Sequence, residues 1–321
     1  MELSGMTNLA VKTFVVTGAS GYIGSHMCFE LRQSYPNCKI IAVDKVQKHK
    51  LKHLYDDFIL MDLAKSGKII FEDNVDCIFH FAALSSVSES ESLPYKYYYN
   101  NILSLTKVLE DAVFMNVKNI IFSSTCAVYG SVKNHNRVHE NMKLNPNSVY
   151  SKSKSMCEEI LLAAEAEHGI RTGILRYFNV AGRNVSANLY EEHDPETHLI
   201  PNIMKDYSVE VYGNNFDTPD GTAVRDYIHV IDICKAHIKT YVYMVEKKRN
   251  LLCNIGTGKN HSVLQIIAAV EEVTGKKVNV ELRARRIGDV DFLVSDISKM
   301  TSELAFRPEH DIVSMIKSIM E

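Results

Sequence analysis

The chain has 321 residues, of which 46% are hydrophobic and 23% charged, and its formal net charge is −3 at pH 7. This length allows two domains, and the composition is typical of a globular protein. A slightly negative charge gives no general electrostatic reason to bind nucleic acid or anionic lipid, so we expect neither a nucleic-acid nor a membrane partner. The sequence also lacks a run of about 20 apolar residues, which argues against a transmembrane helix.

The N-terminal residues and the cysteines predict a reduced, cytoplasmic protein. Residues 1–11 contain neither a basic segment nor an apolar segment of the kind that begins a secretory signal. The seven cysteines show no Cys-x-x-Cys spacing, which favours free thiols over a disulfide framework or a zinc site.

The first expected element is a short strand followed by a glycine-rich turn. Residues 13–17 are apolar and β-branched, residues 18–24 read Gly-Ala-Ser-Gly-Tyr-Ile-Gly, and a helical pattern begins at about Ser25. Such glycines let a backbone turn sharply and approach a pyrophosphate, which then faces the N-terminus of the helix. The turn therefore indicates a dinucleotide site, although a plain strand–turn–helix connection would also explain three glycines alone.

The second strand, at 39–43, ends in Asp44, about 20 residues after the last glycine. A carboxylate in this register binds the ribose hydroxyls of adenosine and repels a 2′-phosphate, so it favours NAD over NADP. Lys45 beside it weakens this preference, and an aspartate that merely ends a strand is the alternative.

Three further strands are expected at 58–61, 77–81 and 119–122, separated by segments long enough for helices. This alternation predicts a doubly wound parallel sheet, in which ligands lie at the carboxyl ends of the strands. Polar or small residues follow these strands, namely Asp62, Leu63, Phe81, Ala82, Ala83 and Ser123. We expect Asp62 to reach adenine and the two alanines to leave room for the dinucleotide, unless these residues only cap their strands.

Two other patterns receive structural interpretations. The aromatic run at 95–101 predicts packing at the start of an amphipathic helix. His135 and His139 have helical spacing but lie in a polar segment with no third ligand apparent, so we predict no metal site.

Tyr150 and Lys154 are four residues apart, which places both side chains on one face of a helix. A free tyrosine has a pKa of about 10, and lowering it to about 7 requires about 4 kcal/mol of preferential stabilisation of the phenolate. A lysine one turn away and a cationic nicotinamide ring can supply this, which would make Tyr150 a general base. A solvated helix face is the alternative for this pair taken alone.

Together these motifs resemble the extended short-chain dehydrogenase/reductases and, within them, the UDP-glucose 4-epimerases. The segments that carry the resemblance are 17–24, 80–83, 122–130, 150–154, 175–182, 194–201, 221–230, 254–258 and 285–289. The glycine turn identifies only the superfamily, whereas 194–201 and 221–230 are more specific to the 4-epimerases.

The resemblance implies an α/β fold, a Rossmann-like doubly wound parallel sheet with a smaller, split α/β C-terminal substrate domain. Residues 1–182, with returns near 226–257, would bind NAD, and residues 183–321 would mainly bind the UDP-sugar. It also implies a homodimer through the helices after Tyr95 and around Tyr150. The apolar stripe of Met156, Ile160, Leu161 and Ala164 fits this dimer, but core packing explains it equally well.

The implied reaction is NAD-dependent 4-epimerisation, most specifically of UDP-glucose and UDP-galactose, through a transient 4-keto sugar. Tyr150 would take the proton of the 4-hydroxyl while C4 passes its hydride to NAD, and the hydride would return to the other face of the turned sugar. NAD would stay tightly bound and be regenerated in each turnover. Lys154 would lower the tyrosine pKa and hold the nicotinamide ribose, and Thr125 would bridge the 4-hydroxyl and the phenolate.

The resemblance also implies the binding residues. Those for the cofactor are Gly18, Gly21, Tyr22, Ile23, Gly24, Asp44, Lys45, Asp62, Leu63, Phe81, Ala82, Ala83, Ser85, Asn100, Ser123, Tyr150, Lys154 and Tyr177. Those for the substrate are Thr125, Tyr150, Phe178, Asn179, His198, Leu199, Val211, Tyr212, Arg225, Arg286 and Asp289. Guanidinium groups suit a diphosphate, so the two arginines are expected there, with a structural ion pair as the alternative. Asp289 would bind the uridine ribose and Tyr212 would lie against uracil.

Some residues restrict the reaction and others leave it open. Cys126 and Ala127 lack the acid and base groups of the related 4,6-dehydratases, which disfavours dehydration. Ser85 removes a cofactor contact, and Leu293 leaves open whether 2-acetamido sugars are accepted. UDP-GlcNAc, a UDP-uronate and a UDP-pentose remain alternative substrates. A non-catalytic NAD-binding regulator is the alternative of another class, but it predicts a damaged Thr/Tyr/Lys set, and all three are present.

Overall fold

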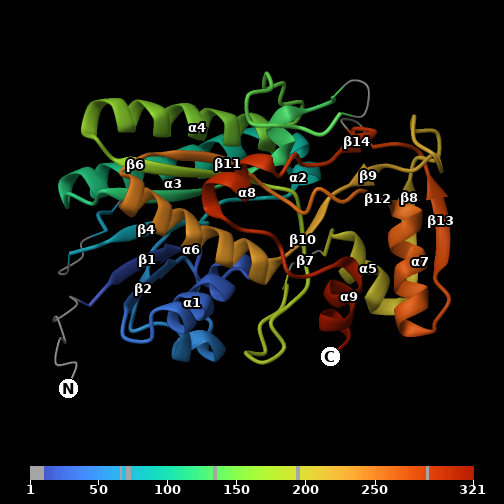
Figure 1. Cartoon of the computed structure of the whole chain (residues 1–321), viewed down its shortest axis with the longest axis horizontal. Helices are drawn as coiled ribbons and strands as arrows, with labels where there is room; N and C mark the ends of the chain where they lie inside the picture. Colours follow the sequence, from blue (N-terminus) through green and yellow to red (C-terminus); the bar gives the residue numbers. More distant parts are fainter. Residues whose placement is uncertain (1–10, 66, 70–73, 133–135, 193–195, 287–288) are drawn as a thin grey trace, which may run out of the picture.

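The computed structural model describes residues 11–65, 67–69, 74–132, 136–192, 196–286 and 289–321. Figure 1 shows a large body built on one central sheet, with a smaller group of helices and strands beside it. Within these ranges, no helix combines the length and the apolar character needed to cross a bilayer.

The central sheet has seven parallel strands in the order β11-β6-β5-β4-β1-β2-β3. Their bounds are β1 (Thr13–Thr17), β2 (Lys39–Asp44), β3 (Asp57–Leu60), β4 (Cys77–His80), β5 (Asn119–Thr125), β6 (Arg171–Tyr177) and β11 (Leu251–Ile255). The strand order reverses at β1, between β2 and β4, which is where doubly wound sheets open a ligand crevice. The predicted fold class is therefore confirmed.

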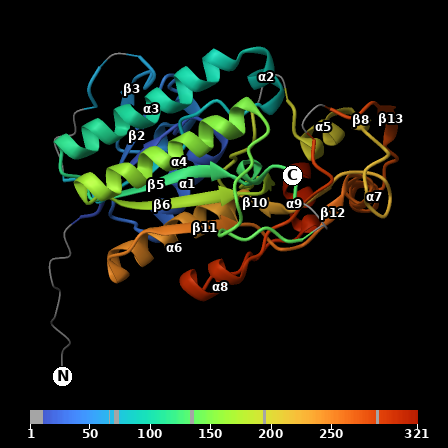
Figure 2. The same ribbon diagram turned by 90° about the horizontal axis from the view of Figure 1, so that it is seen from above.

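Helices cover both faces of the sheet. Figures 1 and 2 show α3 (Pro94–Phe114) and α4 (Val149–His168) side by side on one face. The other face carries α1 (Tyr22–Ser34), α6 (Val230–Lys247) and α8 (Ser298–Leu304). The alternation of side chains along β1 supplies both layers, because Phe14 and Val16 pack toward α1 and α6 while Val15 packs toward α3 and α4.

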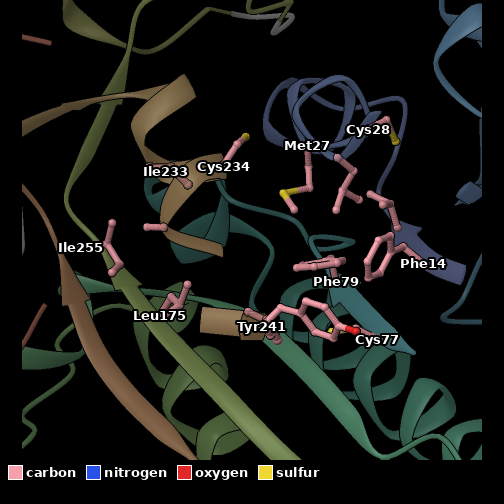
Figure 3. Packing of buried hydrophobic residues seen from close by; sticks show 14 of the residues in the cluster. Phe14, Met27, Cys28, Cys77, Phe79, Leu175, Ile233, Cys234, Tyr241 and Ile255 are labelled. Carbon is pink, nitrogen blue, oxygen red and sulfur yellow. The ribbon is translucent and has the colours of Figure 1, made fainter. Parts of the chain in front are cut away.

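The layer under α1 and α6 is closely packed around aromatic rings. Figure 3 shows Phe14, Phe79 and Tyr241 below Met27 and Cys28. The ring centroid of Phe14 lies 5.8 Å from that of Phe79 and 5.2 Å from that of Tyr241, both in edge-on geometry. Each such buried side chain contributes about 1.5–3 kcal/mol. This packing holds the strands, and therefore the residues at their carboxyl ends, in a fixed arrangement.

A second set of elements lies beside the main body. The main body itself also contains the short helices η1 (His49–Leu54), α2 (Val87–Ser92) and η2 (Cys126–Tyr129). The second set comprises β7 (Asn179–Ala181), α5 (Leu199–Asp206), β8 (Ser208–Tyr212), β9 (Val224–Arg225), β10 (Tyr227–His229), β12 (His261–Ser262), α7 (Val263–Thr274), β13 (Asn279–Arg283), β14 (Phe292–Leu293) and α9 (Ile312–Met320). A separate hydrophobic cluster, which includes Ile203, Ile266 and Ile316, packs α5, α7 and α9 together.

The first helix begins earlier than the sequence predicted. It begins at Tyr22 rather than about Ser25, so Gly24 lies inside the first turn. A Cβ atom at Gly24 would lie only 2.1 Å from the carbonyl oxygen of Gly18. The last glycine therefore serves helix–turn packing and does not end the turn.

The aromatic run at 95–101 packs only in part. Tyr97 is fully buried at the start of α3 and its hydroxyl donates to Glu89, 2.7 Å away. Tyr95, in contrast, is 85% exposed, and Tyr99 is 59% exposed. One turn of α3 directs only one of these rings inward, so the predicted packing holds for Tyr97 and is wrong for its two neighbours.

Candidate active site

The carboxyl ends of β1, β4, β5 and β6 and the start of α4 enclose a cavity of about 420 Å³, called here the central cavity. A second cavity of about 300 Å³, called the β2–β3 cavity, continues beside it. The two share Gly18, Gly21, Phe81 and Ala83 as lining residues. They form one groove across the point where the strand order reverses.

The glycine turn forms the floor between the two cavities. Gly18 has a φ of +71°, and a Cβ atom there would lie 2.8 Å from the amide nitrogen of Ala82. Only a residue without a side chain therefore fits between β1 and the end of β4. The N-terminus of α1 follows at Tyr22, so this turn fits a pyrophosphate.

Asp44 lies at the carboxyl end of β2 and lines the β2–β3 cavity. Its Oδ2 atom accepts from the backbone N–H of Ser20 at 2.9 Å, and Oδ1 accepts from that of Val46 at 3.2 Å. These bonds fix the carboxylate beside the glycine turn and leave it with further lone pairs for hydroxyl donors. Asp62 and Leu63 line the same cavity after β3. The residues of the groove thus suit an adenosine at one end and a pyrophosphate at its centre.

A phenol, a hydroxyl and an ammonium group line the central cavity. Tyr150 and Lys154 project from one face of α4, and Thr125 ends β5. The side chains of Thr125 and Tyr150 are hydrogen-bonded. The Nζ atom of Lys154 donates to the carbonyl oxygen of Ser123 at 2.7 Å and lies 4.7 Å from the ring centroid of Phe122. Strand β5 therefore orients the lysine, through Ser123 and Phe122, while the tyrosine faces the cavity.

Burial has opposite effects on the two titratable groups of α4. It raises the pKa of Tyr150 despite the hydrogen bond with Thr125, which lowers it. It lowers the pKa of Lys154 to about 8. The protein groups alone therefore hold Tyr150 protonated at neutral pH, so a phenolate requires further positive charge in the cavity.

The start of α4 is fixed by Ser148, which caps the helix. Its Oγ atom accepts from the N–H of Ser151 at 3.1 Å, and its own N–H donates to Oγ of Ser151 at 3.0 Å. This reciprocal pair holds the first turn, which carries Tyr150. Asn147 and Ser148 also line the central cavity, and sequence reasoning missed both. For Ser148, the available signal was the Ser-x-x-Ser spacing of residues 148–151, which spans Tyr150.

Arg225, at the end of β9, also lines the central cavity and carries a positive charge. Its Nη1 atom donates to the carbonyl oxygens of Val224 at 2.9 Å and Val290 at 2.8 Å. Nη2 lies 3.8 Å from Oδ1 of Asp289, which is a loose ion pair. The guanidinium group therefore keeps donor capacity for a ligand, although part of it serves the structural role that was the alternative.

His198 lines the central cavity and forms ion pairs with Glu191 and, at 3.4 Å, with Glu196. Burial lowers the pKa of His198, but the hydrogen bonds to the two glutamates outweigh this effect and raise it. The ligand atoms of these three residues lie within 4.8 Å of one another. His135, considered above for a metal site, lies outside the described residues.

The groove collects most of the predicted binding residues. Every predicted cofactor residue lines one of the two cavities. The predicted substrate residues that line the central cavity are Thr125, Tyr150, Phe178, Asn179, His198, Arg225 and Asp289.

Four predicted substrate residues do not line either cavity: Leu199, Val211, Tyr212 and Arg286. The side chain of Val211 is buried in the cluster under α5 and α7, and Leu199 packs against the same cluster. Arg286 instead lies over the ring of Tyr212, with its Cζ atom 3.7 Å from the ring centroid. The guanidinium group therefore covers one face of the ring against which uracil was expected to lie.

The groove also includes residues that the sequence analysis did not select. They are Ser20, Val46, Lys48, Met61, Ala64, Leu84 and Ser104 in the β2–β3 cavity, and Val87, Ser124, Cys126, Ala127, Gly130, Asn147, Ser148, Val180, Val290 and Leu293 in the central cavity. Most are sequence neighbours of selected residues, so adjacency to a predicted strand end was the signal for them.

Comparison with known proteins agrees with this geometry. Residues 14–256 match the model of the NAD dependent epimerase/dehydratase family. A UDP-glucose 4-epimerase of Lactobacillus helveticus is 37% identical over 313 residues, which cover 93% of each chain. One from Streptococcus mutans is 36% identical, with 94% of this chain and 93% of the relative covered.

Solved structures show the same fold. The UDP-glucose 4-epimerase of Stenotrophomonas maltophila, with bound NAD and formylated UDP-arabinopyranose, superposes with a TM-score of 0.87 at 31% identity, covering 96% of each chain. That of Bifidobacterium longum, in complex with NAD+ and UDP, gives a TM-score of 0.85 at 31% identity over 96% of each chain. The chain therefore belongs to the NAD dependent epimerase/dehydratase family and, within it, to the UDP-glucose 4-epimerase group.

Proposed function

We propose that this protein is an NAD-dependent epimerase that interconverts UDP-glucose and UDP-galactose at C4. The observation that carries this function is the convergence of Tyr150, Thr125 and Lys154 on one cavity that also contains the glycine turn. A sugar hydroxyl in that cavity can reach both hydroxyl groups, as general-base catalysis requires. A non-catalytic regulator would not need this set of groups.

When bound in the groove, NAD would supply a hydride acceptor and, through its cationic nicotinamide ring, the positive charge that favours a phenolate. Tyr150 takes the proton of the sugar 4-hydroxyl and returns it after the sugar has turned. Thr125, already hydrogen-bonded to Tyr150, orients that hydroxyl. Lys154 holds the nicotinamide ribose and adds positive charge near the phenol. Asp44 binds the ribose at the other end of the groove.

The substrate side binds the nucleotide diphosphate. Arg225 offers the planar donors that suit a diphosphate, and Asp289 beside it accepts from the uridine ribose. Asn179 and the imidazolium of His198 add donors to the same wall. We retain Tyr212 and Arg286 as residues near the uracil, which requires the stacked pair to open when the base binds.

We also propose the division into a cofactor domain, residues 1–182 with returns near 226–257, and a substrate domain, mainly 183–321. The separate hydrophobic cluster of α5, α7 and α9 supports this division, and so does β11, which joins the central sheet from beyond β10. A cytoplasmic location is part of the same proposal and is supported by seven cysteines that are all buried and free.

A homodimer through α3 and α4 completes the proposal. Leu103, Met156 and Leu162 on these helices are exposed, which is expected of a face that another copy covers. Leu161 and Ala164 of the predicted stripe are instead buried in the core between these helices and the sheet. The stripe therefore divides between core packing and a surface available for a second copy.

The test is incubation of the purified protein with UDP-galactose and no added coenzyme, with UDP-glucose as the product that is followed. We expect conversion, and we expect NAD or NADH to be released when the protein is denatured. UDP-GlcNAc, UDP-glucuronate and UDP-xylose are assayed in parallel. Faster conversion of one of these would assign the protein to that substrate, and no conversion of any would contradict the proposal.

A further inference from the structure

A buried charged network lies directly behind the catalytic residues and takes no part in the mechanism described above. Its centre is Glu158 on α4, whose carboxylate pairs with Arg176 of β6. Both residues, and Ser124 on β5, are at most 3% exposed. The three residues come from three different elements that carry or adjoin the catalytic groups.

The carboxylate of Glu158 is fully engaged by directional bonds. Its Oε1 atom accepts from Nε of Arg176 at 3.0 Å and from the hydroxyl of Ser124. Its Oε2 atom accepts from Nη2 of Arg176 at 2.6 Å. The guanidinium and the carboxylate therefore meet in a two-point fork, which fixes orientation as well as distance.

Ser124 connects this pair to the catalytic residues. It lies between Ser123, whose carbonyl oxygen receives the Lys154 ammonium, and Thr125, which is hydrogen-bonded to Tyr150. In the sheet it lies opposite Arg176. Helix α4 is thus joined to two adjacent residues of β5, by Lys154 at Ser123 and by Glu158 at Ser124, four residues apart on the helix.

The same network extends away from α4 into neighbouring elements. Nη1 of Arg176 donates to the hydroxyl of Tyr129 at 3.0 Å, and that hydroxyl donates to Oδ1 of Asn254 at 2.7 Å. Tyr129 ends η2, which follows Thr125 directly, and Asn254 lies in β11. The segments on both sides of Thr125 are therefore anchored to one ion pair, Tyr129 through the guanidinium group and Ser124 through the carboxylate.

Stability alone is a weak reason for such an arrangement. A buried ion pair loses solvation on folding, and apolar residues of similar volume often stabilise a core as well or better. The hydroxyl of Ser124 likewise adds a directional bond where an alanine would fit. The directional bonds of the network fix the position of α4 along β5, which apolar packing would not do.

We propose that Glu158, Arg176 and Ser124 are positioning residues that hold α4 against β5, so that Tyr150 and Thr125 meet the same sugar hydroxyl. This inference rests on the proposed function. A misplacement of about 1 Å between reacting groups can lower a rate by about 10²-fold. The charged side chains of Glu158 and Arg176 line neither cavity, so their loss should affect kcat rather than substrate binding.

The test compares kcat, KM and bound NAD in three variants. Ser124→Ala removes one hydrogen bond, and Glu158→Gln keeps the shape of the side chain but removes its charge. The double variant Glu158→Met/Arg176→Met replaces the pair by apolar groups. The control is Asp111→Asn at the far end of α3, because Asp111 is similarly buried and accepts from Lys107 and from the N–H of Ile69.

We expect kcat to fall about 5-fold in Ser124→Ala and about 10-fold to 100-fold in Glu158→Gln, with KM for UDP-galactose and NAD content unchanged. In the double variant the melting temperature should recover relative to Glu158→Gln while kcat stays low. The control should lose stability but keep its kcat. If Glu158→Gln does not fold, Ser124→Ala decides.

A kcat of Ser124→Ala in the wild-type range would overturn the inference, as would full recovery of kcat together with the melting temperature in the double variant. A fall of kcat in Asp111→Asn equal to that in Glu158→Gln would also overturn it. The proposed function fails in a different way, because wild-type protein would then convert no UDP-sugar.

Discussion

The two walls of the central cavity are built in different ways. The sheet wall, formed by the ends of β1, β4, β5 and β6 with α4, is held by parallel strand pairing and buried polar bonds. The loop wall, formed by His198, Arg225, Asp289 and Val290, lies outside the central sheet and is held largely by partly exposed ion pairs. The difference suggests that the sheet wall positions the chemistry, which tolerates little displacement, while the loop wall recognises the nucleotide and can adapt.

The strongest test of the sheet wall is Tyr150→Phe. Removing the hydroxyl deletes the general base but leaves the ring and the helix cap in place, so kcat should fall by about 10²-fold or more. Single-turnover formation of NADH from UDP-galactose measures the step directly. Thr125→Val should lower the same rate, because the hydrogen bond to Tyr150 is lost. Near-normal turnover of Tyr150→Phe would contradict the assignment of the base.

The walls also differ in how well the sequence predicted them. Asp44 and the residues after β3, β4 and β5 were predicted correctly as neighbours of one groove, because parallel strands bring their carboxyl ends to a single edge. No comparable rule places residues of connecting segments. Val211 alternates into the core of the second cluster, and the contact of Arg286 with Tyr212 joins a strand end to a segment 74 positions later. The sequence also did not predict the contact between Glu158 and Arg176, because the register of a helix against a strand is set only when the chain has folded.

On the loop wall, Arg225→Met should mainly affect substrate binding. The loss of charge-assisted hydrogen bonds to a diphosphate, worth about 1.5–3 kcal/mol each, should raise KM for UDP-galactose by about 10-fold or more. NAD content should stay unchanged, because Asp44 lies in the β2–β3 cavity, which Arg225 does not line. Arg283→Met is the matched control, since Arg283 pairs with Glu210 at 2.8 Å on β8 and does not line either cavity. An equal rise of KM in both variants would argue against a diphosphate contact at Arg225.

The histidines of the two walls should respond to pH with opposite signs. Burial, and then the charge of Lys154, lowers the pKa of His80 from 6.5 to about 3. Below pH 6.5 the unfolded chain therefore takes up a proton that the folded protein does not, and His80 makes folding less favourable as pH falls, by at most about 1.4 kcal/mol per pH unit. The raised pKa of His198 does the reverse: its stabilisation is present at acidic pH and is lost as pH rises through the folded-state pKa.

Urea unfolding measures both effects, for His80→Gln between about pH 5 and pH 7 and for His198→Gln above about pH 7, where only the folded protein keeps the proton. Relative to wild type, the free energy of unfolding should rise less with pH in the first range for His80→Gln, and fall less with pH in the second range for His198→Gln. The effect of His198→Gln should be the smaller one, because half of that side chain is exposed and solvent screens its ion pairs. If both substitutions changed the slope of the free energy of unfolding against pH in the same direction, the pKa values of the two histidines would not be shifted in opposite directions.

The smallest effect is expected at Glu192, which lies before α5, lines neither cavity and receives two ammonium groups. Its Oε2 atom lies 2.8 Å from Nζ of Lys48, and its Oε1 atom pairs with Lys50. Although burial raises the pKa of Glu192, the hydrogen bonds from the two lysines outweigh this effect and lower it to about 2. All three side chains are partly exposed, so Glu192→Gln should change the free energy of unfolding by less than about 1 kcal/mol, and by less still at high salt.

Breaking the buried pair by Glu158→Gln should cost about 3–5 kcal/mol under the same conditions. Glu192 pairs with two lysines and Glu158 with one arginine, yet the loss of stability should be several-fold larger for Glu158. The difference would follow from burial, because solvent screens only the pairs of Glu192. A loss in Glu192→Gln as large as that in Glu158→Gln would show instead that partly exposed ion pairs outside the sheet hold the fold as firmly as the buried pair.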